Sequence, residues 1–316
     1  MDMKRVAICG ASGYSGMELT RLLARHPGVE VVAVASGRWS GQSVRERLGI
    51  PGPTGELRYQ PTIDPATEVD ATFFATPADA SQELVPTWQR EGQPVLIDLS
   101  NAYRADEGWV YGLAEYAREQ VAATKQVANP GCYPTATQLG LLPLIRAGLL
   151  ASGPIIVDAK SGVTGAGRKV SDTLLFNELA DNHYPYRVGH HQHVPELERQ
   201  LEREVIFTPH LIPARRGLLV SCYVPLQAGK SADDVRACLA ERYAKEPLVN
   251  LAEPGDTVGI GSVAHTPTCR VAVGPTVKQG YARVFSSIDN LLKGAASQAV
   301  QNLNLSLGLP ETQGLM

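Results

Sequence analysis

The sequence has no apolar stretch that approaches the roughly 20 residues needed by a membrane-spanning helix. Its first residues are charged, and the apolar run after them is too short for a signal peptide. Basic residues are not in excess: the formal net charge is -3, with no run of like charges and no alternation of aromatic and basic residues. We therefore expect a cytoplasmic protein that binds neither membranes nor nucleic acid.

Cysteine is sparse, and its spacing argues against two common uses. The five cysteines are odd in number, widely spread and never spaced as C-x-x-C, which disfavours a disulfide framework and a zinc knuckle. A reducing compartment fits this pattern, and we expect no bound metal. A small anionic substrate remains compatible with the composition, through local arginines. The cysteines are Cys9, Cys132, Cys222, Cys238 and Cys269.

The chain of 316 residues is long enough for two domains, each with its own core. In the first third, short apolar runs alternate with helical patterns, which indicates βαβ units and an α/β fold with a Rossmann-type doubly wound parallel sheet. The expected strands are residues 6–9, 29–35, 71–75 and 95–99; the expected helices are one that carries Leu19, Leu22 and Leu23, and another over residues 80–90.

Beyond residue 150 the pattern changes to that of a more open sheet, which predicts a second, α+β domain. The last helical pattern, residues 289–302, is expected to pack back on the first domain. The predicted domains are therefore residues 1–132 plus 290–316, and residues 133–289. Expected strands of the second domain are residues 155–159, 205–208, 218–225, 270–273 and 282–287, with a helix over residues 231–244.

The first expected strand leads into GASGYSG, which has the spacing G-x-x-G-x-x-G rather than G-x-G-x-x-G. Glycines at a strand-to-helix turn allow the turn itself, the approach of a pyrophosphate and close packing of helix on strand. A glycine turn alone is weak evidence, but the strand before it and the helix after it favour a dinucleotide site. The expected contacts are Gly10, Ser12, Gly13, Tyr14, Ser15 and Gly16.

The second expected strand ends in ASGR, without the acidic residue that would bind a ribose 2′-hydroxyl. The hydroxyl of Ser36 and the guanidinium of Arg38 suit the additional phosphate of NADP instead. The alternative is that Arg38 is a solvated loop charge. The sequence therefore favours NADP or NADPH as the cofactor.

Cys132 stands in NPGCYPTAT, after a glycine and at an expected helix start. Backbone N–H groups at such a position stabilise a thiolate, so Cys132 is a candidate nucleophile. The alternative is a small apolar residue that fills a turn.

The segment HHQHVPE contains His190, His191 and His193. A metal site is the weaker interpretation, because no Cys, Asp or Glu lies beside these histidines at the usual zinc spacing. A histidine near its unperturbed pKa suits a general base that activates a thiol. Surface or helix-capping histidines before PELERQLER are the structural alternative.

Nine stretches along the whole chain carry a resemblance. They are GASGYSGMELTRLL, FFATPADAS, IDLSNAYR, YGLAE, NPGCYPTAT, KSGVTGAGRK, HHQHVPE, TPHLIPARRG and DNLLKGAASQAVQN. In this order they resemble the N-acetyl-γ-glutamyl-phosphate reductases, the arginine-biosynthesis branch of the acyl-phosphate-reducing semialdehyde dehydrogenases. The resemblance implies NADPH-dependent reduction of N-acetyl-γ-glutamyl phosphate to the 5-semialdehyde and phosphate through a cysteine thioester, in a homodimer or homotetramer.

The resemblance also implies roles for individual residues. Cys132 is the expected nucleophile and His191 the expected base, with His193 lining the substrate pocket. Asn290 is expected near the nicotinamide, and Arg216 is expected to hold the substrate anion. Further expected cofactor contacts are Thr76, Pro77, Ser161 and Gly162, and further expected substrate contacts are Arg104, Asn129 and Glu196.

Two departures from the pattern concern the substrate. Ala214 and Ala114 stand where the family commonly has Met and Pro, and a sister branch reduces a carrier-bound aminoadipyl phosphate in lysine biosynthesis.

A non-enzymatic NADP-binding redox sensor is the alternative from another class. It would need a resolving cysteine, and no second cysteine lies close to Cys132 in sequence.

Overall fold

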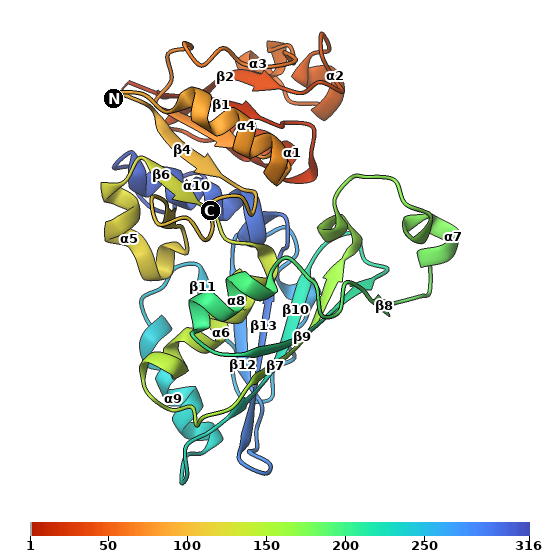
Figure 1. Ribbon diagram of the computed structural model, residues 1–316, viewed down its shortest axis with the longest axis vertical. Helices are drawn as coiled ribbons and strands as arrows, with labels where there is room; N and C mark the ends of the chain where they lie inside the picture. The colour runs from red at the N-terminus through yellow and green to blue at the C-terminus, as the bar shows by residue number, and fades with distance from the viewer. Residues whose placement is uncertain (1) are drawn as a thin grey trace. The chain divides into compact units, whose positions relative to one another are not determined.

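A computed structural model of the chain describes residues 2–316, which form two compact units (Figure 1). The first unit runs to Gly131 and resumes at Ala295; the second unit is Cys132–Gly294. The predicted boundaries, residues 132 and 290, lie one and five residues from the observed ones, 131 and 295. The larger difference arises because Asp289 and Asn290 bond to Arg216 and Gly217 inside the second unit.

The first unit contains a six-stranded sheet in the order β2-β1-β3-β4-β6-β5, and every neighbouring pair is parallel. β3 and β4 are buried at every position, as expected for a sheet covered on both faces. The sheet confirms the predicted α/β class. Its strands are β1 (Lys4–Cys9), β2 (Val29–Ala35), β3 (Ala71–Phe74), β4 (Val95–Asp98), β5 (Val110–Tyr111) and β6 (Gln126–Ala128).

The helices of the first unit bury apolar residues at helical spacing. In α1, Leu19, Leu22 and Leu23 all face the core, as their spacing predicts. Phe74 and Trp88 pack edge to face in an apolar cluster that includes Leu96. The helices are α1 (Tyr14–Leu23), α2 (Val44–Leu48), α3 (Gly52–Glu56), α4 (Ala78–Trp88), α5 (Ala114–Ala123) and α10 (Ser297–Ser306).

The last helical segment differs from the single helix predicted over residues 289–302. A π-turn, Leu292–Ala296, precedes α10, and the Gly294 N–H donates to the Asp289 carbonyl five residues earlier. The Asp289 side chain accepts from the N–H groups of Leu291 and Leu292, so it occupies the position of a cap. The segment therefore changes helical geometry just before α10 begins.

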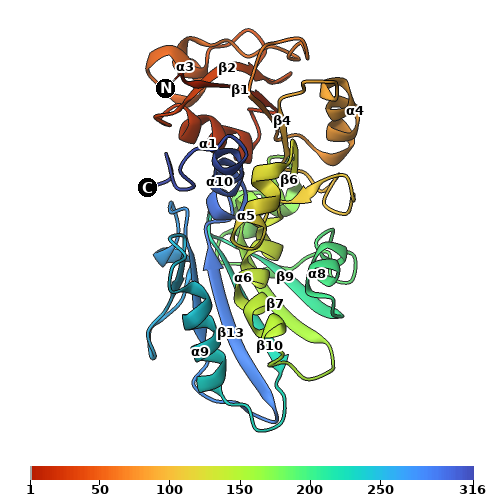
Figure 2. The same ribbon diagram turned by 90° about the vertical axis from the view of Figure 1, so that its left-hand side faces the viewer.

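The second unit contains a seven-stranded mixed sheet, in the order β11-β12-β13-β10-β7-β9-β8. Figure 2 shows β13, β10, β7 and β9 among these strands. β10 pairs antiparallel with both β7 and β13, while β7 and β9 are parallel. This agrees with the predicted α+β domain. Its strands are β7 (Ile155–Gly162), β8 (Tyr184–Pro185), β9 (Val205–Ile212), β10 (Leu218–Pro225), β11 (Val249–Leu251), β12 (Cys269–Val273) and β13 (Tyr281–Ile288).

One face of the second sheet is covered by α6, whose residues from Tyr133 to Leu144 are all buried. Val284 and Ser286 of β13 point toward Gly140 of this helix, whereas Phe285 alternates with them and points to the other face. α6 also contacts α8 and α9. The helices of this unit are α6 (Cys132–Arg146), α7 (Phe176–Leu179), α8 (Val194–Leu201) and α9 (Ala232–Tyr243).

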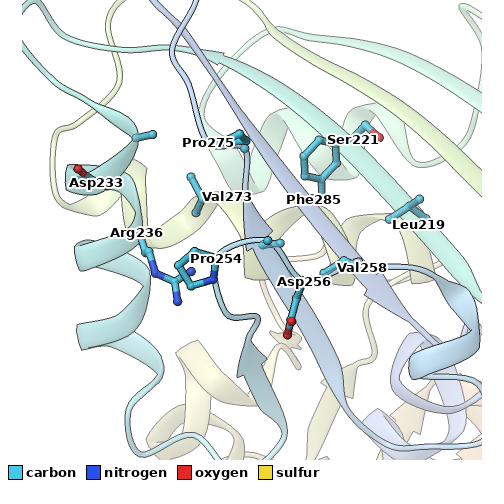
Figure 3. A pocket seen from close by; sticks show the side chains of 14 residues that line it. Leu219, Ser221, Asp233, Arg236, Pro254, Asp256, Val258, Val273, Pro275 and Phe285 are labelled. Carbon is cyan, nitrogen blue, oxygen red and sulfur yellow. The ribbon is translucent and has the colours of Figure 1, made fainter.

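The opposite face of the second sheet is hollowed by a cavity of about 580 Å³ (Figure 3). Leu219, Ser221 and Phe285 line it from β10 and β13, and Arg236 reaches it from α9. Tyr223 of the same face is 37% exposed, so this side of the sheet lacks the helical cover that the α6 side has within residues 2–316.

Candidate active site

The glycine loop of the first unit lies at the point where the strand order reverses, between β1 and β3. In doubly wound sheets ligands bind at this point. Gly10 has φ +82°, and a Cβ added there would lie 2.5 Å from the Ala75 carbonyl oxygen. The loops that follow β1 and β3 are therefore in direct contact, and only glycine fits between them.

The sequence-predicted cofactor residues of the first unit gather around this contact. Ser36, after β2, donates to the hydroxyl of Ser12 at 2.7 Å and accepts from the Trp39 N–H. Thr76 bonds through its hydroxyl to Ser81 in α4, and Pro77 is the N-cap residue of that helix. Three loops, one from each of the first three strands, thus meet at one edge of the sheet.

The helix that follows the glycine loop begins without a capping side chain. Gly13 occupies the N-cap of α1, so backbone N–H groups of the first turn, beginning with Tyr14 and Ser15, lie at its open end. At Gly16, an added Cβ would collide with the Gly10 carbonyl, which explains the third glycine by close packing of helix and loop. A helix start of this kind suits a phosphate group. Arg38 is exposed just beyond Ser36.

In the second unit, Cys132 is the first residue of α6 and is half-buried. Gly294 packs directly on it: an added Cβ at Gly294 would lie 2.6 Å from the Cys132 Cβ. Three of the other four thiols differ, because burial raises the pKa of Cys9 and of Cys222 to about 12 and also raises that of Cys238. Position at a helix start therefore distinguishes Cys132 as a candidate thiolate.

A cluster of rings surrounds the residue next to Cys132. The Tyr133 ring lies 5.7 Å from that of His191 and 5.9 Å from that of His193, edge to face in both cases. Tyr186 completes the cluster, with its hydroxyl 3.4 Å from His191 Nε2 and 3.5 Å from the Tyr133 hydroxyl. The structure thus brings the two predicted histidines together with two tyrosines that sequence reasoning missed.

The charge of a Cys132 thiolate reaches both tyrosines. Burial is the main cause that raises the pKa of Tyr186 to about 12, and the Cys132 charge raises it further. Burial also raises the pKa of Tyr133 well above its usual range, with smaller contributions from Tyr186 and Cys132. Both hydroxyls therefore stay protonated at neutral pH. The sequence carried one usable signal for Tyr133, its place directly after the cysteine.

The hydrogen bonds of His191 define its tautomer. The backbone N–H of His193 donates to His191 Nδ1 at 3.1 Å, so in the neutral ring the proton is on Nε2, which faces Tyr186. Burial, aided by the nearby charges of Arg187 and His190, lowers the pKa of His191 to about 4. The ring is therefore neutral at pH 7 and offers a hydrogen from Nε2.

Three other residues of HHQHVPE, which are His190, His193 and Glu196, lie in different surroundings. His190 is exposed and bonds through Nδ1 to the carbonyl of Val188. His193 is the N-cap residue of α8, and within residues 2–316 its side chain makes no capping hydrogen bond. Glu196 is buried in the first turn of that helix, three residues after His193 in the sequence.

The three cofactor residues predicted in the second unit also gather. Asn290 donates through Nδ2 to the Thr164 hydroxyl and accepts at Oδ1 from the Gly217 N–H. A Cβ added to Gly165 would lie 2.6 Å from the Ser161 Oγ and 3.8 Å from the Asn290 Nδ2. Gly162 packs on the backbone of Arg216, where a Cβ would come within 2.8 Å. Thr164 is a member that sequence reasoning missed.

Arg216, predicted to hold the substrate anion, is bonded within the second unit. Its Nε lies 2.9 Å from a carboxylate oxygen of the fully buried Asp289, and its Nη1 lies 2.8 Å from the Nδ1 of His265. Asp289 also accepts from the His265 N–H. The guanidinium is thus held next to Asn290, and Asp289, which immediately precedes Asn290 in DNLLKGAA, is a further residue that sequence reasoning missed.

Arg104 and Asn129, predicted as substrate contacts, lie together in the first unit. The Arg104 guanidinium donates from Nε to the Asn129 carbonyl at 2.9 Å and from Nη2 to the Leu99 carbonyl at 3.0 Å. Asn129 is 1% exposed, and its side chain bonds to Asn302 and Ala295. In this structure both residues organise the backbone that leads to Cys132.

Two features of other protein classes are missing from the described part of the chain. Within residues 2–316, no group of three or more His, Cys, Asp or Glu side chains is placed to hold a metal ion. None of the helices in the same range combines the length and the apolar character needed to cross a bilayer.

Two family models match the chain, and they divide it close to where the structure does. Residues 5–124 match the model described as "Semialdehyde dehydrogenase, NAD binding domain". Residues 132–290 match the model described as "Semialdehyde dehydrogenase, dimerisation domain". The glycine loop falls in the first match, and Cys132, His191 and Arg216 fall in the second.

Named relatives are similar to the chain along its whole length. The N-acetyl-gamma-glutamyl-phosphate reductase of Magnetococcus marinus is 40% identical and aligns with 98% of this chain and 97% of its own. The enzyme of that name from Brevibacillus brevis is 39% identical, with coverage of 99% and 98%. Among solved structures, aspartate semialdehyde dehydrogenase II from Vibrio cholerae has a TM-score of 0.79 at 20% identity, covers 98% of this chain and 99% of its own, and supports the fold alone.

Proposed function

Because the chain belongs to the semialdehyde dehydrogenase family, we propose that it reduces N-acetyl-γ-glutamyl phosphate to N-acetylglutamate 5-semialdehyde and phosphate, with NADPH as reductant. The similarity to reductases of that name over 98% of the chain is the observation that carries this proposal. It gives the protein a place in arginine biosynthesis.

Cys132 is the proposed nucleophile. Its thiolate sulfur bonds to the acyl carbon, the bond from that carbon to the phosphate oxygen breaks, and phosphate leaves with the electron pair. The N-terminus of α6 supports the thiolate through its backbone N–H groups, and the same groups suit the oxygen that becomes negative during attack. The product of this half-reaction is a thioester on Cys132.

His191 is the proposed proton-transfer residue, and its tautomer specifies how it acts. With Nδ1 accepting from His193, the neutral ring donates from Nε2, which suits an oxygen that gains negative charge. To act as the expected base, the ring needs an Nε2 without a hydrogen, which requires the tautomer protonated on Nδ1. The Tyr186 hydroxyl, 3.4 Å from Nε2, is the proposed hydrogen-bond partner of this nitrogen in both tautomers.

The residues at the switch point of the first unit fit a dinucleotide, because glycines, an open helix start and serine hydroxyls meet there. Gly10 to Gly16, Ser36, Thr76 and Pro77 would hold it, and Arg38 would bind the additional phosphate of NADP. When bound, the cofactor supplies the hydride that converts the thioester into the aldehyde. Ser161, Gly162 and Asn290 are the proposed contacts in the second unit.

The proposed substrate contacts are supported by different observations. His193 and Glu196 are buried, as His191 is, which supports a place in the substrate pocket. Arg216 supplies a cation next to Asn290, although Asp289 and His265 already bond to it. Arg104 and Asn129 donate within the protein, so we propose that they support the loop before Cys132.

The proposed activity is tested in the reverse direction. N-acetylglutamate 5-semialdehyde, phosphate and NADP should give NADPH, which is followed by its absorbance, and the aminoadipate analogue should react far more slowly. Equal or faster reaction of the aminoadipate analogue would assign the chain to the lysine branch. No reaction with either aldehyde would refute the reductase proposal.

We further propose that the protein acts in the cytoplasm as a homodimer or homotetramer. The match to a dimerisation domain over residues 132–290 supports self-association. The sheet face opposite α6, with its apolar Phe285, Leu219 and Tyr223, is the proposed contact surface. Light scattering measures the oligomeric state and distinguishes monomer, dimer and tetramer. Phe285→Asp should disrupt the assembly, because it places a charge on the proposed contact surface.

A further inference from the structure

The chain passes between its two units twice. Within the first unit, one buried side-chain amide, that of Asn129, hydrogen-bonds to both connecting segments. The chain leaves after Gly131 and returns at Ala295. The side chain of Asn129 donates through Nδ2 to the carbonyl of Ala295 at 3.3 Å and to that of Pro130 at 3.4 Å. Asn129 therefore connects the outgoing segment to the returning one.

The orientation of this amide is set by Asn302 on α10. Asn302 is fully buried, and its Nδ2 donates to Asn129 Oδ1 at 3.0 Å and to the Gly112 carbonyl at 2.9 Å. Because the Gly112 carbonyl only accepts, the Asn302 amide must present its nitrogen to both partners. With its oxygen bonded to Asn302, the Asn129 amide must direct its nitrogen to Ala295 and Pro130.

Both segments that the Asn129 amide connects lie next to Cys132. Asn129, Pro130 and Gly131 lead directly into Cys132, and Arg104 holds the Asn129 carbonyl from outside. On the returning segment, Ala295 follows Gly294, whose Cα side packs on Cys132. Asn129, Cys132, Gly294 and Ala295 thus lie on one closed ring of covalent bonds and contacts, so we expect a change at Asn129 to affect both segments next to the thiol.

We propose that Asn302 is a positioning residue for Cys132: by orienting the Asn129 amide, it fixes the two segments that hold the nucleophile at the start of α6. This proposal rests on the proposed function for its catalytic meaning. Without Asn302 the buried Asn129 oxygen loses its donor, and the amide is free to turn and release Ala295. The thiol then loses its alignment with the helix N-terminus, on which its reactivity depends.

The test measures the reactivity of Cys132 without substrate. The rate of its alkylation by iodoacetamide is followed against pH, with mass spectrometry of the Cys132 peptide, for wild type and Asn302→Ala. We expect the alkylation midpoint to move to higher pH in the variant, and kcat to fall roughly 10- to 100-fold with little change in the KM for NADPH. Asn129→Asp, which keeps the acceptor for Asn302 but loses the donors, should behave in the same way.

The matched control is Asn304→Ala on the same helix. Asn304 is also fully buried, but its Nδ2 donates to the carbonyls of Glu311 and Gln313 and its Oδ1 faces His26. A general loosening of α10 should lower the melting temperature in both variants, whereas only Asn302→Ala and Asn129→Asp should alter Cys132. If Asn302→Ala fails to fold, Asn129→Asp carries the test alone.

Two results would overturn the proposal: a wild-type alkylation profile in the Asn129→Asp and Asn302→Ala proteins, or an equal change in Asn304→Ala. Neither depends on turnover, because alkylation needs no substrate. Failure of the reductase proposal would instead appear as inactivity of the wild type in the aldehyde assay. The two failures are therefore distinguishable.

Discussion

At the scale of single residues, the proposed chemistry depends on one thiol and one imidazole. Cys132 begins a helix and is half-buried, whereas burial disfavours the thiolates of Cys9 and Cys222. His191 is neutral at pH 7 because burial lowers its pKa. The sequence singled out Cys132 by its place at an expected helix start, whereas among the three histidines only the resemblance favoured His191. Neither could predict the tautomer of His191, which depends on the backbone of His193 and on Tyr186.

Replacement of Cys132 by Ala should lower kcat by about 1,000-fold or more and leave NADPH binding unchanged, because the nucleophile is lost while the glycine loop is intact. Steady-state assays and NADPH fluorescence titration provide the two readouts. Cys238→Ala is the control, since burial raises the pKa of that thiol and α9 holds it outside the ring cluster. A similar loss of kcat in Cys238→Ala would contradict the assignment of Cys132 as the nucleophile.

The lowered pKa of His191 predicts a dependence of stability on pH. The unfolded state binds a proton near pH 6.5 and the folded state only near about 4, so stability falls as the pH drops through this window. Between about pH 7.5 and about pH 5 this group should remove about 2 kcal/mol of the free energy of unfolding. Urea denaturation of wild type and His191→Gln at both pH values measures the difference.

In that comparison His26, whose pKa burial also lowers, is present in both proteins and cancels. The wild type should lose more stability than His191→Gln on acidification. An equal loss in the two proteins would show that the His191 ring is protonated as easily in the folded state as in the unfolded one.

At the scale of elements, the longer strands of the first unit were predicted well and the shortest was not. The apolar runs of β1, β2, β3 and β4 are long enough to show a pattern, and each was predicted within a few residues. β5, with two residues, is too short to carry any period. The π-turn before α10 was missed because its hydrogen bond, from the Gly294 N–H to the Asp289 carbonyl, leaves no periodicity in the sequence.

The loop after β2 should determine the choice of dinucleotide. Arg38→Ala should lower the ratio of kcat/KM for NADPH to that for NADH by roughly 10-fold, because a charged hydrogen bond to the 2′-phosphate is lost. Arg47→Ala is a matched control: Arg47 is also an exposed arginine of this region, but its guanidinium stacks 4.5 Å from the Trp39 ring. The same change in both variants would indicate a general field effect rather than a specific contact.

At the scale of the whole molecule, the chain divides where its chemistry divides. The glycine loop lies in the first unit, and Cys132, the proposed nucleophile, is the first residue of the second unit. The change in the pattern of strands beyond residue 150 indicated a second domain, but by itself it did not mark where the first unit ends. The sequence could not predict the amides of Asn129 and Asn302 as partners, because 173 residues separate them in sequence.

The central claim is that the acyl group is transferred to Cys132, and trapping that intermediate tests it most directly. The protein is mixed with N-acetyl-γ-glutamyl phosphate without NADPH, quenched in acid, and its peptides are weighed by mass spectrometry while released phosphate is measured. We predict an N-acetylglutamyl mass increase on the peptide that contains Cys132, with a matching burst of phosphate. A phosphate burst without that adduct, or an adduct on another cysteine, would contradict the account.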